Sequence, residues 1–158
     1  MKSRGQIWLI VGAVVSLAVA ILHIVIVFIG PSAYNFFGGT RLARLAAGGS
    51  SSPATMTLTL AAVHFVFGIY GLSGAGILRR LPFLAIGLFI IGGLYTFRGL
   101  SVINQTIQIL TDPGSLPVRV VLYSVVFFVT GCAYIVGTVQ SWGWLQEKKE
   151  RGSDTFSA

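Results

Sequence analysis

The chain has few charged residues, and acidic ones are the scarcest. Only 9% of its 158 residues are charged, and Asp and Glu together number 4. An ordinary soluble domain carries roughly 25% charged residues, so this composition cannot cover a water-facing surface. The four carboxylates lie outside the long apolar runs, at Asp112, Glu147, Glu150 and Asp154. Their positions exclude a carboxylate-based proton antiporter and a di-iron carboxylate oxidase.

Cysteine and histidine are also rare. Cys132 is the only cysteine, which excludes an intrachain disulfide and a CxxC redox pair. Histidine occurs twice, at His23 and His64. Two imidazoles without a thiolate pair or a carboxylate leave the coordination shell of zinc or copper incomplete. Transport of these metals is therefore disfavoured.

Long apolar runs are what the chain has in abundance, and 54% of its residues are hydrophobic. Four runs, at about residues 7–30, 56–78, 81–109 and 118–144, are each near or above the ~20 residues that cross a bilayer as a helix. We therefore expect an all-α integral membrane protein. Its predicted fold is an antiparallel, up-down-up-down four-helix bundle in one domain, residues 1–145, followed by a polar cytoplasmic tail at 146–158.

The basic residues predict the orientation of these spans. Seven fall on one side of the predicted bundle and three on the other. The larger set is Lys2, Arg4, Arg79, Arg80, Lys148, Lys149 and Arg151, and the smaller set is Arg41, Arg44 and Arg119. Because positive loops stay inside, both termini are predicted to be cytoplasmic, in the plasma (inner) membrane. The net charge of +7 is divided among helix ends, which favours anionic lipid headgroups over nucleic acid as its partner.

The connection between the first two runs is the longest. Within it, Thr40 can cap a short amphipathic helix over residues 40–47, which would lie at the membrane interface as a lid. A disordered loop is the alternative, since the sequence GGSSSP that follows is flexible in composition.

Small residues recur at helical spacing in the first two runs. The first run has Gly12, Ser16 and Ala20 followed by His23, and the second has Ala61, His64, Gly68, Gly71 and Ala75. Such faces let transmembrane helices approach closely, within one chain or between the subunits of a homo- or hetero-oligomer. We interpret Ser73 as part of this packing, because it lies about 13.5 Å along the helix from His64, too far for a nucleophile–base pair.

Several polar residues are predicted to lie in the outer half of the bundle. His23 and His64 are level, each roughly 10–12 Å below the outer boundary, and Arg98 lies roughly 14–16 Å deep but can extend outward. On one continuous helix, Tyr95, Arg98 and Gln105 would share a face, and Tyr123 approaches from the fourth run. These six residues form the predicted ligand-binding site.

Arg98 and the histidines each leave alternatives open. With no carboxylate in any span, Arg98 must meet a polar neighbour, a lipid phosphate or the anion of a ligand. The histidines could be hydrogen-bonded packing residues, could line a lipid or quinone pocket, or could be the two axial ligands of one b-type haem. These residues suggest a single cofactor, haem, and a single pair of metal ligands, His23 and His64.

The function expected from this pattern is binding. The leading hypothesis is an outer pocket for an amphipathic, anionic ligand, such as a lipid, a quinone or another hydrophobic small molecule. A haem electron-transfer protein and a structural or accessory membrane subunit are the alternatives. No arrangement of catalytic residues is recognisable, so enzymatic activity is not the leading expectation.

Overall fold

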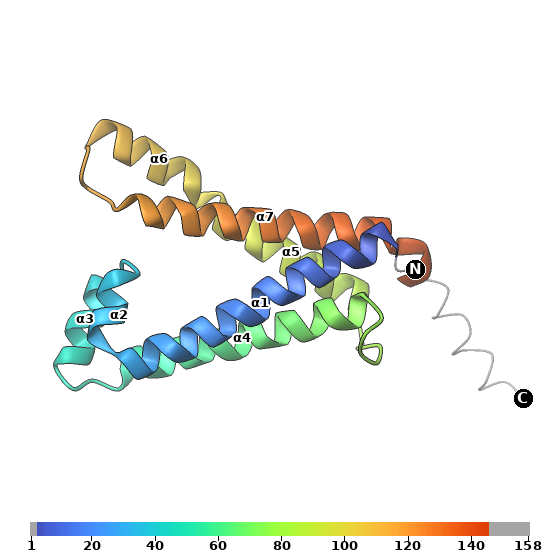
Figure 1. Cartoon of the computed structure of the whole chain (residues 1–158), viewed down its shortest axis with the longest axis horizontal. Coiled ribbons are helices and arrows are strands. Elements are labelled where there is room, and N and C mark those ends of the chain that lie inside the picture. Colours follow the sequence, from blue (N-terminus) through green and yellow to red (C-terminus); the bar gives the residue numbers. More distant parts are fainter. Residues whose placement is uncertain (1–2, 146–158) are drawn as a thin grey trace, which may run out of the picture.

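The computed structural model describes residues 3–145, and within that range it is helical and contains no strand (Figure 1). Seven helices follow one another along the chain. They are α1 (Arg4–Ile29), α2 (Pro31–Phe36), α3 (Thr40–Ala47), α4 (Ser52–Gly74), α5 (Leu84–Gly99), α6 (Ser101–Thr111) and α7 (Val118–Gln140). The predicted tail at 146–158 lies outside the described residues.

Four helical segments are long and apolar enough to cross a membrane: Arg4–Ile29, Ser52–Gly74, Leu84–Thr111 and Arg119–Gln140. Their outward faces carry large apolar side chains, with Phe28 86% and Phe97 78% exposed. Apolar surface on this scale is normal against lipid and rare on a soluble monomer. The prediction of an all-α chain with four membrane-length helices is therefore confirmed.

Local sequence explains where α1 and α4 begin and end. The Ser3 hydroxyl caps the Gln6 amide and the Gln6 side chain caps the Ser3 amide, which starts α1. Gly30, at φ +79°, ends it. The second span was predicted at 56–78, but α4 covers 52–74, because Pro53 fits the first helical turn and the Ser73 hydroxyl holds the following loop.

The third span is divided, which the sequence did not predict. One helix was expected over 81–109, but α5 ends at Gly99 and α6 begins at Ser101. A Cβ on Gly99 would lie 2.5 Å from the backbone nitrogen of Phe128, so glycine is needed where α5 crosses α7. The Ser101 hydroxyl also donates to the Arg98 carbonyl oxygen, and glycine–serine pairs are a known cause of breaks in helices.

The helices pack as two groups, α1 with α4, and α5 and α6 with α7. α1 contacts both α4 and α7, and α5 contacts α7, whereas α4 and α5 share a smaller contact. The helices α1, α4, α5 and α7 come together at the end of the bundle that carries the N-terminus (Figure 1). Toward the opposite end, which carries α2 and α3 and is here called the hairpin end, α1 and α4 diverge from α6 and α7 (Figure 1).

The small-residue faces meet one another inside the chain. A Cβ on Gly71 would lie 2.8 Å from the Ala13 Cβ and 2.9 Å from the Tyr134 hydroxyl, and a Cβ on Gly12 would lie 2.8 Å from the Tyr134 ring. These glycines therefore bring α1, α4 and α7 together around Tyr134, which is fully buried. A contact between copies of the chain would have to use other residues.

The long connection is a helical hairpin rather than a loop. The helix predicted over 40–47 is present as α3, although its N-cap is Gly39 and Thr40 makes no capping bond. The preceding α2 was not predicted. Ala33 and Tyr34 of α2 are buried against Ile26 of α1 and against α3, so the hairpin is anchored to the end of the first span.

Candidate functional site

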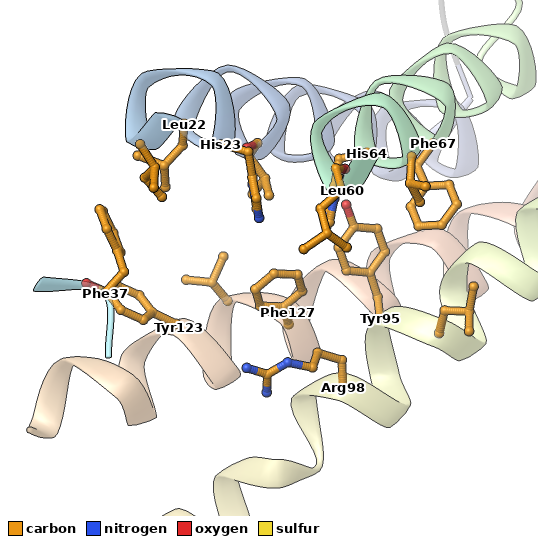
Figure 2. Close-up of a pocket in the computed structure, with 15 residues that line it drawn as sticks. Leu22, His23, Phe37, Leu60, His64, Phe67, Tyr95, Arg98, Tyr123 and Phe127 are labelled. Atoms are coloured by element: carbon orange, nitrogen blue, oxygen red, sulfur yellow. The ribbon is translucent and has the colours of Figure 1, made fainter. Parts of the chain in front are cut away.

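A pocket of about 520 Å³ lies where the two groups of helices diverge (Figure 2). A volume of this size is typical of a small-molecule site. Its walls come from α1, α4, α5 and α7, with one residue from the segment between α2 and α3. The lining residues are Val19, Leu22, His23, Ile26, Phe37, Leu60, Val63, His64, Phe67, Leu94, Tyr95, Arg98, Tyr123, Val126 and Phe127.

One wall presents both histidines. The Nδ1 atom of His23 lies 2.7 Å from the Val19 carbonyl oxygen, and Nδ1 of His64 lies 2.7 Å from the Leu60 carbonyl oxygen. Each ring is therefore fixed to its own helix one turn back. The rings stack with centroids 5.2 Å apart and planes inclined by 20°, so the two residues lie side by side. Figure 2 shows both rings pointing into the pocket from the same side.

Arg98 lies on the opposite wall, in the last turn of α5. Its guanidinium donates one hydrogen bond, 2.6 Å long, to the Ser101 hydroxyl and lies 5.6 Å from the centre of the Phe127 ring. A guanidinium has five N–H donors, so most of them have no partner within the described residues. Asp112, at the far end of α6, carries the single side-chain carboxylate within residues 3–145.

The two tyrosines contribute their rings to the pocket wall. The Tyr95 ring meets His64 edge to face, at 5.7 Å between centroids, but its hydroxyl points into the core and donates to the Ser16 hydroxyl at 2.8 Å. Tyr123 packs on Phe37 at 5.5 Å between ring centroids. The Tyr95 hydroxyl is thus occupied by a hydrogen bond within the core, and the Tyr95 ring is the part that lines the pocket.

Gln105 is the one predicted site residue that does not line the pocket. Its side-chain carbonyl accepts a hydrogen bond of 2.8 Å from the Ser124 hydroxyl, and its amide lies 3.4 Å from the Ser101 hydroxyl. The predicted common face with Tyr95 and Arg98 required a continuous third helix. Because that helix is divided, Gln105 instead joins α6 to α7, and it shares the Ser101 hydroxyl with Arg98.

The segment between α2 and α3 reaches the pocket at the hairpin end. Phe37 follows α2 and lines the pocket, and the Arg119 side chain of α7 donates to the Phe36 carbonyl oxygen at 2.7 Å. The Arg119 guanidinium also lies 4.7 Å from the centre of the Phe36 ring, within the range of a cation–π contact. These contacts connect the hairpin, which is anchored on α1, to the first turn of α7.

Phe37 and Arg119 were missed as site residues. The chain from Pro31 to Phe37 carried a usable signal, because a helix-starting proline is followed by aromatic residues three apart, at Tyr34 and Phe37. Arg119 was recognised only as a charge that reports orientation. Its contact with Phe36 joins residues far apart in the sequence, and a local pattern cannot reveal such a contact.

The polar groups of the pocket are few. Within residues 3–145, no group of three or more His, Cys, Asp or Glu side chains is placed to hold a metal ion. What the pocket offers is a mostly apolar and aromatic lining with two imidazole nitrogens on one side and a guanidinium on the other. No protein-family model, curated protein or solved structure matches this chain.

Proposed function

We propose that the protein binds an amphipathic, anionic ligand, such as a lipid or a quinone-like molecule, in this pocket. The observation that carries the proposal is Arg98: a guanidinium with one hydrogen bond faces a cavity otherwise lined largely by apolar side chains. An arginine within an apolar span is costly unless it is paired, and the spans contain no carboxylate to pair it. The anionic group of a ligand would supply that partner.

The apolar lining supports a ligand with a hydrophobic tail. Leu60 of α4, Leu94 of α5 and Val126 of α7 line the pocket and are themselves exposed on the molecular surface. The pocket is therefore reachable from the apolar side of the bundle, where acyl chains would lie. A ligand dissolved in the bilayer could enter without crossing water.

The orientation proposed with this function places the pocket toward the outer leaflet. The four spans would cross the plasma (inner) membrane in alternating directions, with both termini cytoplasmic and the hairpin outside. The support is the seven-to-three division of basic residues. Arg79 and Arg80, in the loop after α4, belong to the cytoplasmic set.

The haem alternative fits the geometry poorly. Two axial histidines must point at one iron from opposite sides of the porphyrin, so their Nε2 atoms face each other. Here the two rings stack side by side on neighbouring helices and point the same way. This arrangement favours two contacts to one ligand over a bis-histidine haem.

Comparing Arg98→Ala with Arg79→Ala tests the anion contact. Both substitutions remove one exposed arginine, but only the first removes a pocket residue. We expect wild type and Arg79→Ala to retain the same anionic lipids or quinones on purification, measured by mass spectrometry of organic extracts. Arg98→Ala should lose most of them, by about tenfold, as expected for a lost charge-assisted hydrogen bond. Equal retention by Arg98→Ala would refute the proposal.

A further inference from the structure

The protonation of the histidine wall follows from its hydrogen bonds. A carbonyl oxygen can only accept, so at 2.7 Å from the Val19 and Leu60 carbonyls each Nδ1 must carry the proton. In a neutral imidazole the other nitrogen, Nε2, is then an acceptor. Among residues 3–145, neither Nε2 atom has a hydrogen-bond partner. His23 and His64 thus present two acceptors to the pocket.

The two acceptors lie side by side, because the stacked rings have centroids 5.2 Å apart. The pocket has an acceptor wall on α1 and α4, and a donor wall at Arg98 on α5.

Phe127 contacts both walls of the pocket. Its ring centroid lies 6.0 Å from that of His64 and 5.6 Å from the Arg98 guanidinium carbon. Figure 2 shows the Phe127 ring between the histidine side and the arginine side of the pocket. A head group lying against Phe127 would have the Arg98 donors on one side and the histidine acceptors on the other.

We infer that the ligand's head group carries both an anionic oxygen and an oxygen-bound proton, as an alkyl phosphate monoester does. The anionic oxygen accepts from Arg98, and the hydroxyl donates to Nε2 of His23 or His64. A sulfate monoester or an ionised carboxylate has the charge but no proton to give. The apolar lining favours the phosphate monoanion, which keeps its proton, over the dianion. The inference rests on the proposed function and adds the class of head group.

The selectivity follows from the cost of an unpaired acceptor. A site built to receive a hydroxyl rejects an analogue that lacks it, because the buried acceptor loses its water without gaining a partner. Phosphate and sulfate monoesters share a tail and a tetrahedral head and differ by that proton. We expect hexadecyl phosphate to bind about tenfold or more tightly than hexadecyl sulfate.

The experiment measures binding of both amphiphiles, at trace amounts and neutral pH, to the full chain in phosphatidylcholine nanodiscs. Native mass spectrometry gives the two affinities and their ratio. His23→Phe, His64→Phe and the double variant remove acceptors, and Arg98→Ala removes the donor. The ratio should fall toward one in the double variant, whereas Arg98→Ala should weaken both ligands together. Arg79→Ala should leave both affinities unchanged.

The outcomes separate the two proposals. If wild type binds phosphate and sulfate equally, the head-group inference fails while the anionic-ligand proposal stands. If neither amphiphile binds, the proposed function fails with it. A preference for phosphate that persists in the double histidine variant would assign the discrimination to charge alone and would also overturn the inference. Because His23 is only partly buried, His23→Phe keeps the test open should the His64 variant fail to fold.

Discussion

At the scale of single residues, Ser16 joins three helices. Its hydroxyl donates to the Gly12 carbonyl oxygen at 2.9 Å, accepts from Tyr95 at 2.8 Å and lies 3.0 Å from the Tyr134 hydroxyl, which donates to the Phe67 carbonyl oxygen. One buried serine thereby connects α1 with α5 and α7, and through Tyr134 with α4. This network lies beneath the pocket and fixes the Tyr95 ring that forms part of the pocket wall.

Ser16→Ala should destabilise the fold by about 1–3 kcal/mol, because the buried Tyr95 hydroxyl loses its acceptor. Thr106→Ala is the control, since the Thr106 hydroxyl is exposed and, within the part of the chain that the structure describes, bonds only to the Val102 carbonyl of its own helix. Unfolding by dodecyl sulfate titration from mixed micelles gives the two free energies. Equal stability of the two variants would show that the network contributes nothing.

At the scale of helices, glycines set the distance between α1 and α4. We predict that Gly71→Ala destabilises the fold by about 1–3 kcal/mol, because its Cβ would meet the Ala13 Cβ at 2.8 Å and the Leu9 carbonyl oxygen at 3.1 Å. Gly93→Ala meets nothing within 4 Å and should be neutral or stabilising by up to about 1 kcal/mol. The same titration compares them, and a stable Gly71→Ala would argue against close packing here.

The sequence predicted those elements that local composition determines. The length of the apolar runs was enough to predict four spans, and the amphipathic pattern at 40–47 was enough to predict α3. The division at Leu100 depends on how closely Gly99 approaches Phe128, a contact between distant residues. The same division affects the site: five of its six predicted residues line the pocket, while Gln105 bonds Ser124 and the Ser101 hydroxyl that Arg98 also bonds. Helical spacing predicts a shared face only while the helix is unbroken.

For the whole molecule, the proposed orientation is open to a direct test. In a Cys132→Ser background, single cysteines at Ser50 and Ser115 should react with a membrane-impermeant maleimide added to intact cells. A cysteine at Leu78, in the loop after α4, should react only after permeabilisation. All three positions are exposed, so accessibility within the protein does not decide the result. The reverse pattern of labelling would invert the orientation and place the pocket toward the inner leaflet.

The divergence of the two helix groups also has a consequence for the surrounding lipid. The bundle is narrow at the N-terminal end and broad at the hairpin end, where α2 and α3 add to its width (Figure 1). In a bilayer, such a wedge occupies more area in one leaflet than in the other. Insertion of such a wedge costs the least free energy where the membrane bulges toward the hairpin side. The protein would therefore accumulate in membrane regions with that curvature.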